Sequence, residues 1–324
     1  DNTVHILKNA ISKNRLAHAY LFSGPRGTGK TTIARILARE VGCFDEDIIE
    51  IDAASSRGID EARALREAAR TVPFRSPYKV YIIDEVHMLT KEAFNALLKT
   101  LEEPPAHVIF ILATTELEKV PETIISRCQN FSFRKIPENI LRDSVVSIAR
   151  KEGFEIDEEA AGLVALFADG SFRDSQGMLD QVFSLNRDHQ ITGKEIREFL
   201  AVPAVEMVEN FILSVIEKNA EKGLEIIQKI SEQNNDMKVF LKLILRGARS
   251  LLVLRLASGM AEKLKKTLGE REFKFLQEHK DKPQAGEMER ALKILLDAYD
   301  TRARSYLPQL PLELALMKIA SGEN

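Results

Sequence analysis

The stretch from Gly24 to Thr31 has the residue types and the spacing to bind the phosphates of a nucleotide. It reads G-P-R-G-T-G-K-T, the pattern G-x-x-x-x-G-K-T of a phosphate-binding loop. Glycines lack a Cβ atom and tolerate positive φ, so the backbone N–H groups of such a loop can approach phosphate oxygens closely. Lys30 would place a charge at the β- and γ-phosphates, and the hydroxyl of Thr31 would be a ligand of Mg²⁺. The predicted triphosphate-binding residues are Gly24, Pro25, Arg26, Gly27, Thr28, Gly29, Lys30, Thr31 and Thr32.

The segments on either side of this loop are those that must hold it. Residues 18–22 form a short apolar run that predicts a buried strand, and residues 32–40 predict a helix with Ile33, Ile36 and Leu37 on one face. Strand, loop and helix in this order are the setting that a phosphate-binding loop requires. A glycine turn beside an unrelated lysine is the alternative, and the flanking elements disfavour it.

Two carboxylates follow the most apolar predicted strand of the chain, residues 79–85. This strand is apolar on both faces, as expected of a central strand in a parallel sheet. Asp84 would hold Mg²⁺ together with Thr31, directly or through water. The side chain of Glu85 would point elsewhere and take a proton from the attacking water. A solvated acidic strand end, like that at residues 50–52, is the alternative interpretation.

Three further polar residues are candidates, each with a structural alternative. Thr115 follows the predicted strand 107–113 and would orient the water or contact the γ-phosphate, although polar residues are common at strand ends. Arg127 would stabilise charge on the γ-phosphate of a neighbouring subunit, or else pair with a carboxylate at the surface. Arg173, at the start of a predicted helix, would reach the γ-phosphate, or else form a salt bridge with a nearby aspartate.

The order of predicted elements indicates an α/β fold followed by helices. Strands alternate with helices up to residue 135, which predicts a parallel sheet covered by helices on both faces. Ligands of such sheets lie at the carboxyl ends of the strands, where the phosphate loop, Asp84 and Thr115 all fall. The strand signal disappears after Ile136. We predict three domains: a nucleotide-binding core at 1–135, a small helical domain at 136–201 and an all-helical domain at 202–324.

The composition excludes several classes of protein. The chain has 324 residues, of which 44% are hydrophobic and 29% charged, as in soluble globular proteins. No apolar run approaches the roughly 18 residues of a membrane span, and no leader sequence indicates secretion, so a cytoplasmic location is expected. Cys43 and Cys128 suggest no disulfide framework. A net charge of −3 excludes a wholly basic nucleic-acid binder.

Taken together, the motifs resemble those of the AAA+ clamp-loader ATPases, and among them the gamma/tau family of bacterial DNA polymerase III. The matching stretches read G-P-R-G-T-G-K-T-T, D-A-A-S, V-Y-I-I-D-E-V-H-M-L, F-N-A-L-L-K-T-L-E-E-P-P, L-A-T-T and I-S-R-C. They cover residues 16–185 well, and the helical tail matches in character and at residues 310–315.

The resemblance implies a fold and a function. The fold would be an α/β P-loop AAA+ domain with a small helical lid and a C-terminal all-α collar. The chain would hydrolyse ATP with Mg²⁺ as a motor subunit of the clamp loader. It would work in a pentameric ring with other clamp-loader subunits and load the sliding clamp onto primer–template DNA. The implied catalytic residues are Lys30, Glu85, Thr115 as first sensor, Arg173 as second sensor, and Arg127 acting in trans. Arg57 is a candidate DNA contact, or else an exposed loop arginine.

Three departures from the family pattern qualify this expectation. The family carries a four-cysteine zinc module after the helix that follows the phosphate loop, but here Cys43 stands alone and a closed zinc site is not expected. The segment that helps enclose the adenine is missing before Asp1, so no adenine contacts are predicted. The sequence ends after the collar, which suggests the gamma-like ATPase portion. The sequence does not decide between the gamma and the tau form.

Two other functions remain to be separated from the leading one. A structural clamp-loader subunit would bind nucleotide without hydrolysing it, although such relatives usually lack parts of the phosphate loop or the acidic pair. A branch-migration helicase would share the loop and the acidic pair, but the motifs at residues 102–105 and 126–128, and a helical tail in place of a basic winged helix, disfavour it.

Overall fold

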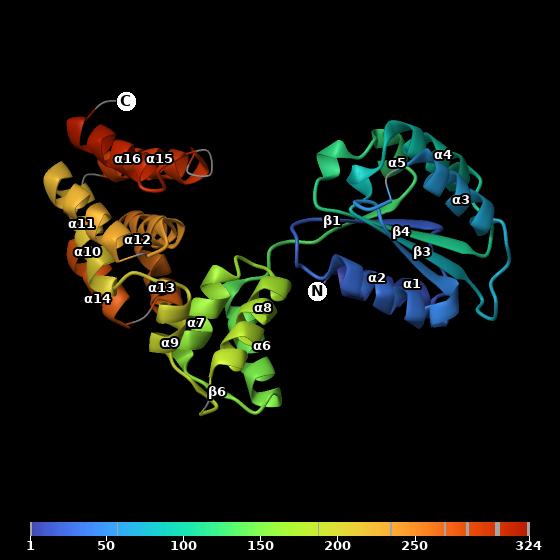
Figure 1. The fold of residues 1–324 in the computed structure, drawn as a ribbon, viewed down its shortest axis with the longest axis horizontal. Coiled ribbons are helices and arrows are strands. Elements are labelled where there is room, and N and C mark those ends of the chain that lie inside the picture. Colours follow the sequence, from blue (N-terminus) through green and yellow to red (C-terminus); the bar gives the residue numbers. More distant parts are fainter. Residues whose placement is uncertain are drawn as a thin grey trace. The chain divides into compact units, whose positions relative to one another are not determined.

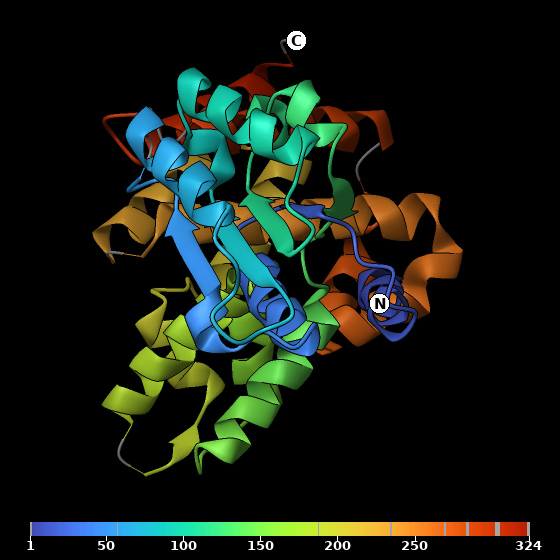
Figure 2. The same cartoon turned by 90° about the vertical axis from the view of Figure 1, so that its right-hand side faces the viewer.

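The computed structural model describes residues 2–56, 58–186, 188–233, 235–268, 270–282, 285–301 and 305–322. The chain folds into two compact units. Figure 1 shows the ribbon with its elements labelled, and Figure 2 shows the same ribbon turned by 90°. The first unit comprises Asp1–Leu141 and Ala168–Gly177, and the second comprises Arg142–Phe167 and Met178–Asn324.

The first unit is built on a five-stranded sheet in which all neighbouring strands are parallel. The strands are β1 (Ala19–Ser23), β2 (Ile48–Asp52), β3 (Lys79–Asp84), β4 (Val108–Thr114) and β5 (Gln129–Ser132). Their spatial order is β2-β3-β4-β1-β5. Strands β1 and β4 are buried along their whole length, whereas the edge strands β2 and β5 are partly exposed. The three central strands therefore end side by side, at one edge of the sheet.

Helices cover both faces of this sheet (Figure 1). Helices α1 (Asn2–Ser12) and α2 (Lys30–Glu40) lie on one face, and α3 (Ile59–Ala69), α4 (Lys91–Glu102) and α5 (Glu122–Ile125) on the other. Successive strand residues point to opposite faces, so Tyr20 packs in the core with Leu37 while Leu21 packs in the core with Leu97. The predicted parallel sheet between two layers of helices is confirmed.

From residue 138 onward the chain is almost entirely helical, as predicted. The helices are α6 (Glu138–Lys151), α7 (Glu158–Phe167), α8 (Phe172–Leu185), α9 (Gly193–Phe199), α10 (Val205–Ile216), α11 (Ala220–Glu232), α12 (Met237–Leu256), α13 (Ala261–Thr267), α14 (Glu270–His279), α15 (Ala285–Thr301) and α16 (Leu310–Ser321). One core joins α6 to α9, and two further cores join α10 to α16. The C-terminal helical region is thereby confirmed, whereas the division into three domains stays a prediction.

The expectation that strands end after Ile136 is wrong in one detail. Strand β6 (Glu155–Ile156) pairs in parallel with β7 (Gln190–Ile191). Two residues are too few to show the alternating pattern by which a strand is recognised in a sequence. Helices α5, α13 and α14 were also not predicted, because α5 has only four residues and α13 and α14 carry few apolar residues.

No described helix is long and apolar enough to cross a membrane. The longest, α12, has 20 residues and carries the charges of Lys238, Lys242, Arg246, Arg249 and Arg255.

One buried carboxylate fixes the loop between α3 and β3. Asp47, in the 3-10 helix η1 (Asp45–Asp47), is 1% exposed. It accepts hydrogen bonds from the backbone N–H groups of Phe74 (2.6 Å), Arg75 (3.1 Å) and Ser76 (3.0 Å). Burial alone would raise the pKa of this carboxyl, but hydrogen bonds from these amides and from the Ser76 hydroxyl hold the pKa at about 2. The carboxylate thus secures the chain where it approaches β3.

Replacement of Asp47 by Asn should lower the free energy of unfolding by about 2 kcal/mol at neutral pH, because buried amides lose a charged acceptor. The difference in the free energy of unfolding between the wild type and Asp47→Asn should shrink as the pH falls from about 4 towards about 2. The folded pKa of Asp47 lies below the ordinary value for Asp, and the carboxylate becomes protonated in this range. Urea unfolding midpoints measured from pH 7 downward test this. The control is Asp45→Asn, which affects only an exposed pair with Arg39 at 3.3 Å. Equal losses in both variants would contradict the assignment.

Candidate nucleotide-binding site

The phosphate loop connects β1 to α2, and its backbone needs glycine. Gly24 has φ +141°, and a Cβ atom there would collide with the backbone carbonyl of Phe133. Gly29, at φ +94°, is the N-cap of α2, and a Cβ atom there would meet no other atom within 4 Å. No side chain caps this helix end, so its first N–H groups are not bonded by a capping residue. An open cradle at a helix N-terminus is what a phosphate group fits.

Lys30 lies buried at the first position of α2, with 6% of the residue exposed. Its Nζ atom donates hydrogen bonds to the carbonyl oxygens of Gly24 (2.7 Å) and Pro25 (2.9 Å). Burial lowers the pKa of this ammonium group, while the nearby carboxylates of Glu85 and Asp84 act in the opposite direction. An ammonium group has three donors, so the two carbonyls leave one for an anion at the loop.

Thr31 and Asp84 join the loop to the central strand β3. The Thr31 hydroxyl donates a hydrogen bond of 2.7 Å to Oδ2 of Asp84, whose Oδ1 accepts from the backbone N–H of Glu85. One hydroxyl and one carboxylate suit Mg²⁺, which usually takes one or two carboxylates together with phosphate oxygens and water. Within the described residues, no group of three or more His, Cys, Asp or Glu side chains forms a metal cage. The donor set therefore fits a magnesium ion shared with a nucleotide.

Glu85 follows β3 in the left-handed region, at φ +47°. Its Oε2 atom accepts hydrogen bonds from the hydroxyl (2.9 Å) and the backbone N–H (3.2 Å) of Thr115, which follows β4. A non-glycine residue at positive φ is uncommon and is found more often at functional sites than elsewhere. The structure thus places Glu85 and Thr115 in direct contact, beside Asp84.

His87 belongs to the same cluster, although sequence reasoning did not select it. Its side chain is 5% exposed, with Nδ1 3.4 Å from Oε2 of Glu85 and Nε2 3.2 Å from Oε1 of Glu116. Glu116 is in turn paired with Lys119 at 2.7 Å. In the sequence, His87 stood out only as a member of the matched stretch V-Y-I-I-D-E-V-H-M-L, two residues after Glu85.

The start of α8 packs against the phosphate loop, which brings Arg173 to it. The backbone N–H of Phe172 donates a hydrogen bond of 2.9 Å to the carbonyl of Gly27. A Cβ atom on Gly27 would lie 3.3 Å from the Cβ atom of Arg173. The charge of Arg173 is also close enough to act on the pKa of Lys30, which it lowers. Asp169, one of the aspartates near Arg173 in the sequence, pairs with Lys135 at 2.7 Å.

Arg127 stands apart from this cluster. It precedes β5, at the amino end of that strand, whereas the phosphate loop leaves the carboxyl end of the neighbouring strand β1. Its Nη2 atom donates to Oε1 of Glu102 (2.8 Å) and its Nη1 atom to the carbonyl of Thr123 (2.7 Å). The structure therefore brings together Lys30, Thr31, Asp84, Glu85, Thr115 and Arg173, but not Arg127. The remaining candidate, Arg57, lies outside the described residues.

The two cysteines are core residues. Cys43 packs in the core on the α2 face of the sheet, and Cys128 packs against the core on the α4 face. Burial raises the pKa of the Cys43 thiol to about 11 and that of Cys128 to about 12. Both thiols are therefore protonated at neutral pH and packed against opposite faces of one sheet, an arrangement that suits neither a shared metal nor a disulfide.

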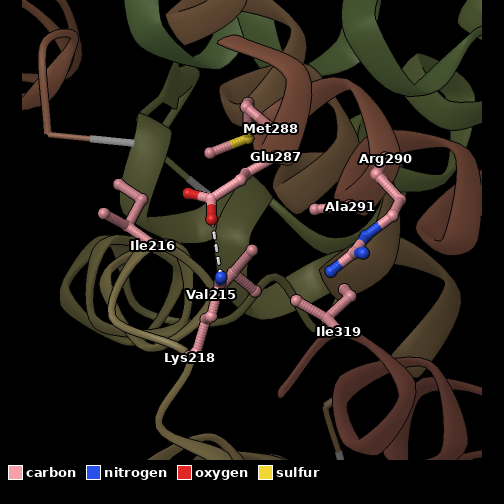
Figure 3. Close-up of a pocket in the computed structure, with 8 residues that line it drawn as sticks. All are labelled: Val215, Ile216, Lys218, Glu287, Met288, Arg290, Ala291 and Ile319. Carbon is pink, nitrogen blue, oxygen red and sulfur yellow. Dashed lines mark hydrogen bonds and ion pairs between the residues drawn. The ribbon is translucent and has the colours of Figure 1, made fainter. Parts of the chain in front are cut away.

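A hollow in the second unit is not the site of the predicted chemistry (Figure 3). It is lined by Val215, Ile216, Lys218, Glu287, Met288, Arg290, Ala291 and Ile319. Lys218 pairs with Glu287 at 2.6 Å across it, and Arg290 donates to the carbonyl of Gly322 at 2.9 Å. These cations are engaged within the chain, and the phosphate-binding motif lies in the other unit.

Comparison with known proteins connects this site to a family. The family described as DNA polymerase III, delta subunit, matches residues 1–50 and 45–137. DNA polymerase III subunit tau of Bacillus subtilis is 38% identical over 336 residues, which cover 97% of this chain and 59% of that protein. DNA polymerase III subunit gamma of Buchnera aphidicola is 38% identical over 250 residues, covering 71% of this chain and 69% of that subunit.

The fold is also similar to that of a solved structure. The RuvB Holliday junction branch migration motor of Thermotoga maritima matches with a TM-score of 0.50 and 22% identity, over 65% of this chain and 72% of that one. At this identity the likeness extends to the fold alone. The sequence relatives decide the family, although the chain spans only 59% of the length of the Bacillus subtilis subunit. With 38% identity across more than two thirds of the Buchnera subunit, the chain belongs to the DNA polymerase III gamma/tau family.

Proposed function

We propose that this chain is an ATP-hydrolysing motor subunit of the clamp loader, which loads the sliding clamp onto primed DNA. The observation that carries the proposal is the hydrogen bond of 2.7 Å between Thr31 and Asp84. It places the end of a phosphate loop against the acidic end of the central strand, with Glu85 as the next residue. This is the arrangement that phosphoryl transfer to water requires.

Binding would begin at the phosphate loop. The uncapped N-terminus of α2 and the buried ammonium group of Lys30 would hold the β- and γ-phosphates. Thr31 and Asp84 would hold Mg²⁺, which neutralises charge on the phosphate oxygens when it is bound. Because burial disfavours the charged form of Lys30, the negative charge of a phosphate would stabilise that form.

Hydrolysis would use the groups at the ends of β3 and β4. Glu85 would accept a proton from the attacking water, and Thr115 would orient the Glu85 carboxylate through the hydrogen bond of 2.9 Å. Arg173 would approach the γ-phosphate from the start of α8. Its position beside Gly27 supports this role.

The site of one chain would be completed by another chain. Arg127 lies at the amino end of β5, away from the loop of its own chain, which supports a role on the ATP of an adjacent subunit. A row of apolar side chains on α16 supports assembly: Leu310, Leu314 and Met317 are 37%, 56% and 48% exposed at helical spacing. The proposed partners are other clamp-loader subunits in a pentameric ring, the sliding clamp and primer–template DNA.

Two substitutions separate nucleotide binding from hydrolysis. Lys30→Ala should weaken ATP binding by about 100-fold, because a charged contact with phosphate is lost. Glu85→Gln should leave ATP binding nearly unchanged but abolish hydrolysis, since the proton acceptor is removed. Equilibrium binding of ATP and steady-state turnover in the assembled complex measure the two effects, with exposed Lys99→Ala as the control.

A wild-type chain that binds ATP but shows no turnover with clamp and primed DNA would indicate a structural subunit. Junction unwinding without clamp binding would indicate a branch-migration motor.

Arg127→Ala should lower the ATPase activity of the assembled complex on the order of 10³-fold, because a trans-acting arginine stabilises the charge that develops on the γ-phosphate. ATP binding by the isolated chain should not change. The control is Arg35→Ala, which breaks a comparable pair with Glu50 at 2.7 Å on another surface. Stimulated hydrolysis at the wild-type rate in Arg127→Ala would show that the trans role is wrong.

Leu314→Glu should weaken assembly, because it places a charge in the middle of the exposed apolar row on α16. Sedimentation of the wild-type and variant chains with their partner subunits measures the loss. Leu256→Glu, at an exposed leucine of α12, is the control. Full assembly of Leu314→Glu would remove α16 from the proposed interface.

A further inference from the structure

Arg127 is held by contacts within its own chain. Its guanidinium donates to Oε1 of Glu102 at 2.8 Å, to the carbonyl of Thr123 at 2.7 Å and to Oγ of Ser126 at 3.4 Å. These three hydrogen bonds restrict the rotation of a side chain that otherwise has many rotamers. The side chain of Arg127 is nevertheless 34% exposed, so it is both restrained and accessible.

The elements that carry this pair are fixed by a common core. Glu102 is the last residue of α4, which ends before Pro104 and packs into the core through Leu101. Arg127 follows α5, whose Ile124 is 1% exposed in the same core. Because both elements are anchored there, the two charged groups meet at a defined place on the surface.

Stability alone does not account for the pair. Its side chains are 34% and 44% exposed, and ion pairs with such access to water contribute little to folding. These hydrogen bonds come from Nη1 and Nη2, and within the described part of the chain no contact uses the Nε–H. The Nε–H is therefore a donor that these contacts leave for a phosphate oxygen.

We propose that Glu102 is a positioning residue for Arg127, which it holds so that the guanidinium, with its Nε–H free, meets the terminal phosphate of the ATP bound by the adjacent subunit. The inference rests on the proposed trans role of Arg127. An arginine supplied across an interface loses side-chain entropy when it is ordered on assembly. An arginine that is already held in place avoids this cost. Without the Glu102 side chain, Arg127 would keep its charge, but its guanidinium would no longer be held in one orientation.

The neighbouring residue provides a matched control. Glu103 is exposed at the C-cap of α4 and carries the same charge. Among the contacts of the described residues, none joins its side chain to Arg127. Any effect of charge in this region would appear in both positions, whereas an effect of positioning would appear only at Glu102.

The test uses the full chain assembled with its partner subunits, the clamp and primed DNA. Glu102→Ala should lower kcat for ATP about tenfold or more while KM changes by less than about twofold, because a misplaced catalytic group affects the transition state rather than ATP binding. Glu102→Gln, which keeps an acceptor of the same size, should have a smaller effect, and Glu103→Gln should have none. In the Arg127→Ala background, Glu102→Ala should cause no further loss, since the two residues act as one unit.

The outcomes separate this inference from the function on which it rests. If Arg127→Ala lowers stimulated hydrolysis but Glu102→Ala does not, only the positioning role is overturned. A rise in kcat for Glu102→Ala would overturn it too, and would show that Glu102 restrains the arginine. If Arg127→Ala has no effect, the trans role itself fails. If Glu102→Ala does not assemble, Glu102→Gln serves as the test variant. A smaller loss of kcat is then expected, and a wild-type kcat would overturn the inference.

Discussion

The hydrogen bond between Thr31 and Asp84 is the contact on which the candidate site depends. It joins two residues 53 positions apart, one from the first turn of α2 and one from the end of β3. The bond is possible because β3, β4 and β1 are parallel neighbours, so their carboxyl ends meet at one edge of the sheet. The other groups of the site are held at the same edge. Lys30 is held there by the phosphate loop, Glu85 because it follows Asp84 in the chain, and Thr115 because it follows β4.

The sequence predicted the fold and the site best at positions where backbone conformation or burial allows only one type of residue. The glycines at 24 and 29 have positive φ, and the apolar runs that predicted β1, β3 and β4 are buried on both faces of a parallel sheet. Asp84 could be selected because a carboxylate at the end of such a strand lies at the ligand edge. These features depend on local conformation and on a pattern of burial, both of which can be recognised in a single sequence.

The residues that were missed depend on contacts between distant segments. His87 becomes part of the site only because the end of β4 and Glu116 lie next to the turn after β3. Glu102 could be recognised in the sequence as part of a motif that ends a helix, but its pairing with Arg127 depends on how α4 packs against α5. The two-residue strands β6 and β7 likewise exist only through their pairing. Sequence periodicity reports the environment of an element, and it does not report which polar groups will meet.

The contact between α8 and the phosphate loop has a consequence for how the site can respond to its ligand. The amide of Phe172 binds the carbonyl of Gly27, in the middle of the loop that would surround the phosphates. Helix α8 is continuous from Phe172 to Leu185, yet its first turns belong to the first unit and the residues from Met178 onward to the second. A displacement of the Gly27 carbonyl must therefore either move the start of α8 or break this hydrogen bond. Gly177, at the division between the units, lies in the interior of α8, where glycine lowers helix stability by about 1 kcal/mol relative to alanine. The division between the two units thus falls at the position of α8 with the lowest intrinsic helix propensity.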